Sequence, residues 1–152
     1  MGENEKDETG ALQLFKQASL LHESGDFHSA ESIYSRFLAL YPENIEGLSG
    51  LCRLKLQVRQ LDEALDLAGR ILLLNKNAGI GYRLIGEIQM ASGYQLDALE
   101  SFDKALSITQ DDAELFFLRG TILRILMRNE EALQAYGRAL QLVPEKAEVL
   151  CN

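Results

Sequence analysis

The sequence predicts an all-α fold built from repeated pairs of antiparallel helices. Apolar and small residues recur every three or four positions, which is the spacing of one helix face. The pattern also repeats with a fixed period of 34 residues, so that Ala98 has counterparts at Ala30, Ala64 and Ala132. No stretch alternates between apolar and polar residues as a strand does. A period of this length predicts stacking, because one helix pair cannot bury its apolar stripe alone.

Four copies fit this register without insertion, at residues 11–44, 45–78, 79–112 and 113–146. Each copy is predicted to hold two helices. Their expected ranges are 11–24, 28–41, 45–58, 62–75, 80–92, 96–109, 113–126 and 130–143. Asp111 and Asp112 are N-cap candidates for the seventh helix. Residues 1–10 are acidic and predict a disordered tail. Residues 147–152 read as the start of an incomplete fifth copy, which favours a fragment of a longer array.

The small and large positions that recur in the copies resemble the tetratricopeptide repeat. In the last copy the matching residues are Phe116, Gly120, Ala132, Tyr136 and Pro144. The second copy departs most, with Lys55, Ala68 and Lys76 where the family has Tyr, Phe and Pro. The resemblance covers Ala11 to Pro144 and implies a right-handed α-solenoid, a superhelix of stacked pairs. It also implies a protein-binding scaffold.

Composition narrows the classes of partner. The formal net charge of −8 argues against nucleic acid and anionic membranes, since both are bound by basic surfaces. No apolar run is long enough to span a bilayer and the N-terminus has no secretory pattern, so we expect a cytoplasmic protein. Cys52 falls in a small-residue slot and is predicted to be a buried thiol, while Cys151 lies near the end. Neither indicates a disulfide framework.

Candidate catalytic and cofactor motifs have simpler explanations. His22, Glu23, Asp26 and His28 gather at one turn, but their spacing matches no zinc motif. The glycines of residues 79–86 do not form a dinucleotide loop, because Leu84 occupies the third glycine position and no strand precedes it. We therefore predict no cofactor and no metal, and expect that the chain is not an enzyme.

The resemblance places a binding site on the first helices of the copies, which line an inner groove in the family. The positions that face this groove combine apolar and charged side chains, which are typical anchors for a protein partner. The predicted groove residues are Phe15, Ser19, Arg53, Leu56, Ile80, Arg83, Glu87, Met90, Phe117 and Arg124. We expect a peptide or protein segment to bind there.

The family's chaperone-binding members grip a carboxylate tail with Lys, Arg and Asn side chains at set positions. This chain has Phe15, Ser19, Gly50, Ile80 and Leu84 there in one register, so that mode of binding is not expected. Two other functions remain open. The chain could be a targeting module of a larger enzyme, for example a glycosyltransferase, or a self-assembling structural protein.

Self-association is predicted at the C-terminal end. The last complete helix has apolar residues that a following helix would cover, and here no complete helix follows in the sequence. Such an apolar patch favours association, most simply a homodimer. The residues expected to take part are Leu133, Tyr136 and Leu140.

Overall fold

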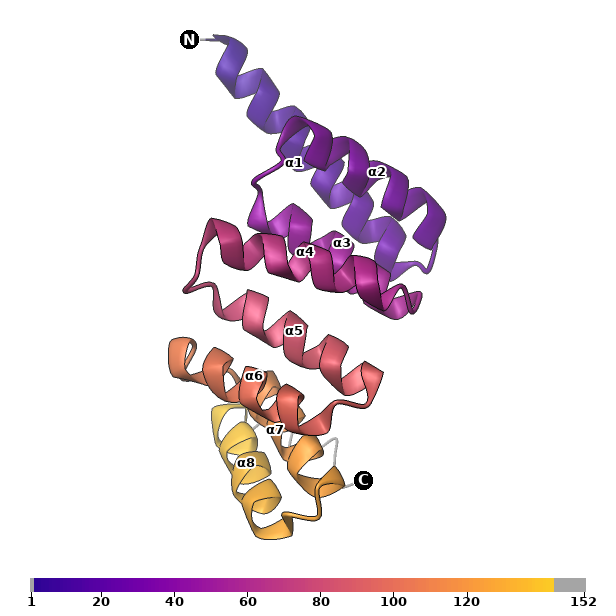
Figure 1. The fold of residues 1–152 in the computed structure, drawn as a ribbon. Helices are drawn as coiled ribbons and strands as arrows, with labels where there is room; N and C mark the ends of the chain where they lie inside the picture. The colour runs from indigo at the N-terminus through magenta and orange to yellow at the C-terminus, as the bar shows by residue number, and fades with distance from the viewer. Residues whose placement is uncertain (1, 144–152) are drawn as a thin grey trace. The chain divides into compact units, whose positions relative to one another are not determined.

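The computed structural model describes residues 2–143 of the chain, with side chains from Gly10 onward. These residues form eight helices and no strand, which confirms the predicted all-α class (Figure 1). The helices are α1 (Gly2–Glu23), α2 (Phe27–Leu40), α3 (Ile45–Gln57), α4 (Leu61–Leu74), α5 (Gly79–Ser92), α6 (Gln95–Ile108), α7 (Ala113–Ile125) and α8 (Asn129–Leu142). Within residues 2–143, none of them combines the length and apolar character needed to cross a bilayer.

Helix bounds agree with the sequence prediction to within one residue from α2 onward. The first helix differs, because α1 begins at Gly2 rather than at Ala11. The structure thus places residues 2–10 in a helix where the sequence predicts a disordered tail. Three Glu residues and Lys6 in this segment favour a helix, and α1 continues through them. The predicted fifth copy, at residues 147–152, lies outside the described residues.

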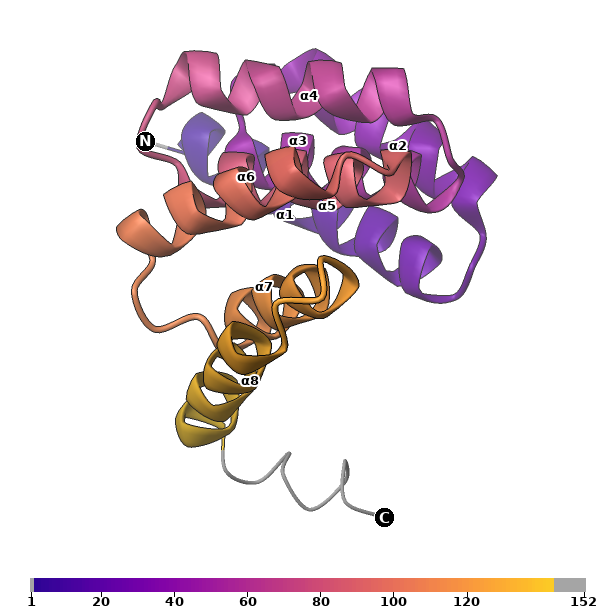
Figure 2. The ribbon, with the colours of Figure 1, turned by 60° about the horizontal axis from the view of Figure 1, so that its bottom comes forward.

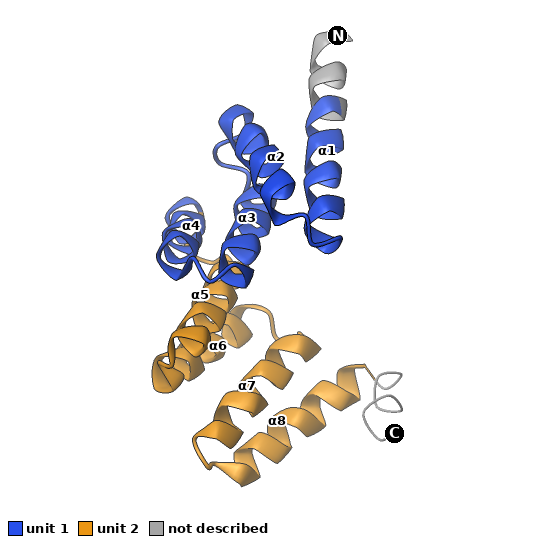
Figure 3. Ribbon diagram, turned by 90° about the vertical axis from the view of Figure 1, so that its right-hand side faces the viewer, with its two compact units in different colours: residues 1–74 blue, residues 75–152 orange. Residues whose placement is uncertain are grey.

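The chain divides into two compact units, Met1–Leu74 and Asn75–Asn152 (Figure 3). In the first unit α1 packs against α2, α3 packs against α4, and α2 also contacts α3. The second unit repeats the scheme, with α5 against α6, α7 against α8, and α6 against α7. Figures 2 and 3 both show α7 and α8 lying side by side. Each unit therefore contains two of the predicted helix pairs.

Side-chain caps fix where several helices begin. Asp26 Oδ1 accepts a hydrogen bond from the backbone N–H of Ser29 at 3.2 Å, and Asn44 Oδ1 accepts one from Gly47 at 2.8 Å. Asp112 Oδ1 does the same for Leu115 at 3.0 Å, which confirms the N-cap role predicted for it. These acceptors satisfy N–H groups that have no partner inside their own helix.

The turn inside each pair uses the left-handed backbone region. The residues at that point have φ values of 83° at Gly25, 64° at Arg59, 86° at Gly93 and 60° at Met127. They lie one repeat period apart. Glycine adopts this conformation without strain, whereas Arg59 and Met127 carry a side chain there. The repeat imposes the turn geometry even where the sequence lacks glycine.

Small residues let the helices of a pair approach closely. Gly86 and Gly120 lie against the rings of Phe102 and Tyr136, where an added Cβ would be within 2.7 Å of ring carbons. Around these contacts the second unit has a continuous apolar core. Its buried members are Ala98, Leu99, Phe102, Ala105, Leu115, Ile122, Leu123, Ala132 and Ala135. The predicted buried thiol, Cys52, is fully buried in the first unit.

The second repeat has a buried lysine that forms two ion pairs. The side chain of Lys55 is only 6% exposed, and its Nζ lies 2.6 Å from Glu31 and 2.8 Å from Glu63. It also donates to Gln60 Oε1 at 2.9 Å. Burial opposes the charge, but the hydrogen bonds and charges of Glu31 and Glu63 outweigh it and raise the pKa of Lys55. Lys55 therefore links α2, α3 and the start of α4 through charge.

Candidate functional site

The predicted groove residues lie on the first helix of each pair, α1 and α3 in the first unit and α5 and α7 in the second. In the first unit, Phe15 packs its ring against Tyr34 and Phe37, with centroids 6.1 and 5.7 Å apart. Ser19 Oγ lies 3.4 Å from the Tyr34 hydroxyl. Phe15 is thus half-buried, and much of its ring serves the α1–α2 contact.

One further contact joins the first helices of the first unit. His22 Nε2 lies 2.5 Å from Gln57 Oε1, which ties the end of α1 to the end of α3. The two predicted groove residues of α3 differ in exposure: Leu56 is half-buried and Arg53 is exposed. Arg53 has no ion pair among the residues that the structure describes. Its guanidinium is therefore available to an outside anion.

Arg83 differs, because three carboxylates surround it. Its Nε lies 2.8 Å from Glu87, its Nη2 lies 2.9 Å from Glu114 and its Nη1 lies 3.5 Å from Asp112. Burial disfavours the charged guanidinium, but the hydrogen bonds to Glu87 and Glu114 more than compensate, so the pKa of Arg83 is raised. The cluster joins α5 to the start of α7. It also means that Arg83 is not a free cation.

The remaining predicted groove residues of α5 are largely occupied by packing. Ile80 is half-buried, and Met90 packs against the apolar core of the second unit. Glu87 is held by Arg83. The exposed part of the predicted site in this unit therefore lies mainly on α7.

One face of α7 carries a row that we call the α7 stripe: Glu114, Phe117, Thr121 and Arg124. Phe117 is 44% exposed, and the neighbouring Ile125 is 47% exposed. The Phe117 ring lies 5.4 Å from that of Tyr136, whose hydroxyl lies 3.3 Å from Thr121 Oγ1. Arg124 is exposed, with no ion pair within the described part of the chain. The stripe is held by its neighbours yet open to solvent.

The same aromatic arrangement occurs at both ends of the described repeats. In the first repeat Phe15 and Ser19 meet Tyr34, and in the fourth Phe117 and Thr121 meet Tyr136 at the equivalent positions. In each case a tyrosine from the second helix reaches a hydroxyl on the first. The sequence identified the individual residues but not this contact, which needs the helix pairing.

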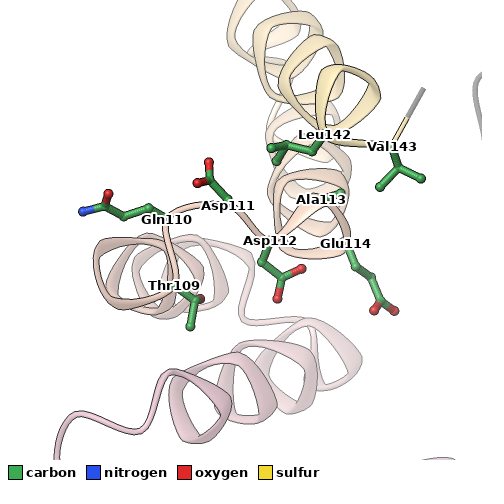
Figure 4. Close-up of a pocket in the computed structure, with 8 residues that line it drawn as sticks. All are labelled: Thr109, Gln110, Asp111, Asp112, Ala113, Glu114, Leu142 and Val143. Carbon is green, nitrogen blue, oxygen red and sulfur yellow. The ribbon is translucent and has the colours of Figure 1, made fainter.

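A pocket of about 570 Å³ opens at the start of α7, beside the end of α8 (Figure 4). Asp112 and Glu114 point to one side of the loop and Asp111 points to the other. Asp112 and Glu114 pair with Arg83, while Asp111 pairs with Arg138 at 3.2 Å. The eight lining residues are Thr109, Gln110, Asp111, Asp112, Ala113, Glu114, Leu142 and Val143. Its carboxylates already have cationic partners.

No group of three or more His, Cys, Asp or Glu residues could hold a metal ion in the part of the chain that the structure describes. In the turn cluster of His22, Glu23, Asp26 and His28, two side chains make structural hydrogen bonds. His22 contacts Gln57, and Asp26 caps α2. The prediction that the chain binds no metal or cofactor stays a prediction.

The residues expected to self-associate lie on α8. Leu133 is 71% exposed, Leu140 is 40% exposed and Tyr136 is half-buried. The first-repeat equivalents of Tyr136 and Leu140, which are Tyr34 and Leu38, are buried where α2 contacts α3. Leu65, the second-repeat equivalent of Leu133, is 46% exposed. Tyr136 and Leu140 therefore lie on a helix-packing face that has fewer neighbours within the described part of the chain.

Sequence and structure comparisons identify relatives. A family model described as tetratricopeptide repeat matches residues 21–88. The human protein O-mannosyl-transferase TMTC1 is 29% identical over 166 residues, and the match takes in 100% of this chain but 19% of that protein. The chain thus spans a small part of this relative.

Solved structures agree in fold. TTC0263, a thermophilic tetratricopeptide repeat protein of Thermus thermophilus, matches with a TM-score of 0.81 and 21% identity over 88% of this chain and 75% of that one. The first such domain of Spaghetti (RPAP3), solved with an HSP90 peptide, has a TM-score of 0.69 and 16% identity over 77% and 93%. The 34-residue helix pairs and the family model show that the chain belongs to the tetratricopeptide repeat family.

Proposed function

We propose that the chain is a non-enzymatic interaction module that binds a peptide or protein segment on the faces of its first helices. The observation that carries the proposal is the α7 stripe, where Phe117 is exposed between charged ends. Exposed aromatic and arginine side chains are the usual anchors of protein interfaces. Arg53 adds an available cation on the first unit.

The relatives support a binding role without naming the partner. The RPAP3 domain was solved with an HSP90 peptide, so a chain of this fold holds a peptide there. At 16% identity that likeness concerns the fold. This chain has Phe15 and Ser19 where the chaperone-binding mode needs donors for a carboxylate, so we do not carry the same ligand over.

A selection from a random peptide library tests this proposal. Peptides that bind the full chain would be measured against Phe117→Ala and against a matched control, Leu96→Ala, which removes an exposed apolar side chain from α6. We expect Phe117→Ala to weaken binding by about tenfold, since anchor truncations typically cost about 1–2 kcal/mol or more. Equal binding by both variants would contradict the proposal.

A second possibility is that the chain is an interaction module within a larger enzyme. It is favoured by the match to a mannosyl-transferase, of which the chain covers 19%. The chemistry would then lie elsewhere in the parent protein. An immunoblot of native protein with antibodies against residues 11–143 tests this, because a module would be detected at a much larger mass than this chain alone.

Self-association through α8 is a separate candidate, favoured by the exposed Leu133 and Leu140. We propose a homodimer in which these residues and Tyr136 are covered by a second copy. Light scattering should show mass rising with concentration up to about 100 µM, the range of weak micromolar association. Leu140→Glu should abolish the rise while circular dichroism shows a folded helix array. A monomer throughout the range would contradict the dimer.

A further inference from the structure

The α7 stripe has opposite charges at its two ends. Glu114, Phe117, Thr121 and Arg124 follow one another at intervals of three or four residues, which places them on one helix face. An acid therefore begins the row, an aromatic ring and a hydroxyl form its middle, and a cation ends it. All four belong to the second unit.

The acidic end keeps negative charge despite its ion pairs. Arg83 is the single guanidinium among Glu87, Asp112 and Glu114, so two negative charges are in excess. The side chain of Glu114 is 69% exposed. A carboxylate accepts several hydrogen bonds, and Arg83 reaches only Oε2 of Glu114. An incoming cation can therefore bind here without displacing Arg83.

The basic end of the α7 stripe is also accessible to a partner. Arg124 is exposed and has no ion pair among the described residues. Between the two ends, Phe117 offers apolar surface to solvent, and Ile125 adds more just beyond Arg124. The charges thus flank an apolar contact area on a single rigid helix.

We propose that the α7 stripe selects an extended segment with a Lys or Arg side chain at one end, an apolar side chain in the middle and an Asp or Glu at the other end. The inference rests on the proposed binding function and names the chemistry of the partner. From Glu114 to Arg124 the helix rises about 15 Å at roughly 1.5 Å per residue. An extended chain covers that in about four or five residues at roughly 3.3 Å each.

Charge complementarity is the reason for this choice of partner. A segment with acids at both ends would place one of them beside Glu114 and its excess negative charge, and like charges at an interface are strongly disfavoured. A doubly basic segment meets the same penalty at Arg124. Because the proposed contacts involve only side chains, the segment can bind in either chain direction.

Synthetic peptides provide the test, using the full chain. The bipolar probe contains Lys-Ala-Leu-Ala-Glu between neutral caps, and the comparison probes replace its charged residues by two Glu, two Lys or two Gln. Fluorescence anisotropy at low salt should give the tightest binding for the bipolar probe, by about tenfold over the doubly acidic one. The preference should shrink as salt is added. A bipolar probe that binds no better than the doubly acidic one would overturn the inference.

Charge reversal on the protein sharpens the test. Glu114→Lys should remove the preference for the bipolar over the doubly acidic probe, and Arg124→Glu should make the doubly basic probe the best. Glu130→Lys is the matched control, because it reverses an exposed acid on α8 and should leave the order unchanged.

The outcomes separate this inference from the proposed function. If neither reversal changes the order of the probes but Phe117→Ala still abolishes their binding, the charge selection is wrong and the binding face stands. If Phe117→Ala also leaves every probe's affinity unchanged, both are wrong. Circular dichroism of each variant confirms that it is folded before binding is compared.

Discussion

Gly86 lies so close to Phe102 that a Cβ on the glycine would be 2.5 Å from the ring carbon Cε1. Phe102 is fully buried, so its ring has little room to move. We predict that Gly86→Ala destabilises the protein by about 1–3 kcal/mol, the usual cost of overpacking a core. Chemical denaturation measures the change.

A second glycine serves as a control that separates the effect of close packing from the effect of helix propensity. Gly137 lies within α8, and a Cβ there would meet nothing within 4 Å. Gly137→Ala should therefore stabilise the protein by about 0.5–1 kcal/mol, because alanine favours helices more than glycine. If both substitutions shift stability in the same direction, close packing at Gly86 is not what requires glycine.

The turns offer a second pair of opposite changes. Met127 adopts a φ of 60° although it carries a side chain, and Gly93 adopts 86° at the equivalent turn. Gly93→Ala should destabilise by about 1 kcal/mol, the cost of a Cβ in the left-handed region. Met127→Gly should be neutral or stabilising by about 0.5 kcal/mol, since relief of strain exceeds the added flexibility of the unfolded chain. Thermal unfolding of both variants tests this, and a clear loss of stability for Met127→Gly would contradict it.

Lys55 provides a prediction on pH. Its pKa is raised above the ordinary 10.5 in the folded protein, so folding favours the charged form. The contribution of its ion pairs is therefore complete at neutral pH and is lost only as pH rises through the raised pKa. We expect Lys55→Met to destabilise by about 1–2 kcal/mol at pH 7, less than for a pair with both partners buried, because Glu31 and Glu63 are partly exposed.

The free energy of unfolding as a function of pH checks this account. The difference between the wild type and Lys55→Met should be constant from neutral pH to the ordinary Lys pKa and should shrink above it. Lys104→Met is the control, since Lys104 forms an exposed pair with Glu100 and should change stability little. A difference that grows with rising pH has the wrong sign for a raised pKa.

The fold was predictable because the repeat period constrains each element four times. Helices α2 to α8 follow from the positions of small and apolar residues, and even the turn at Met127 falls in place by register. The start of α1 was not predictable, because residues 2–10 lie outside the repeats and only their composition was informative. Acidic composition alone does not distinguish a solvated helix from a disordered tail.

The helix that carries each candidate groove residue was predictable from the sequence, but the ion pairs of these residues were not. The sequence places Arg83 on the first-helix face, and the Arg83–Glu87 spacing indicates one of its pairs. Its pairs with Asp112 and Glu114 depend on how α5 meets α7, which no spacing within a helix reveals. Phe15 lies on the first helix, as predicted, but part of its ring packs against Tyr34 and is not exposed to a partner.

Chemical-shift mapping tests the central claim most directly. A peptide selected for binding would be titrated into isotope-labelled full chain, and amide shifts followed for each helix. The account predicts the largest changes on the α7 stripe, at Phe117, Thr121 and Arg124, with smaller changes on the second helices α2, α4, α6 and α8. Saturable shift changes confined to those second helices, with the α7 stripe unaffected, would contradict it.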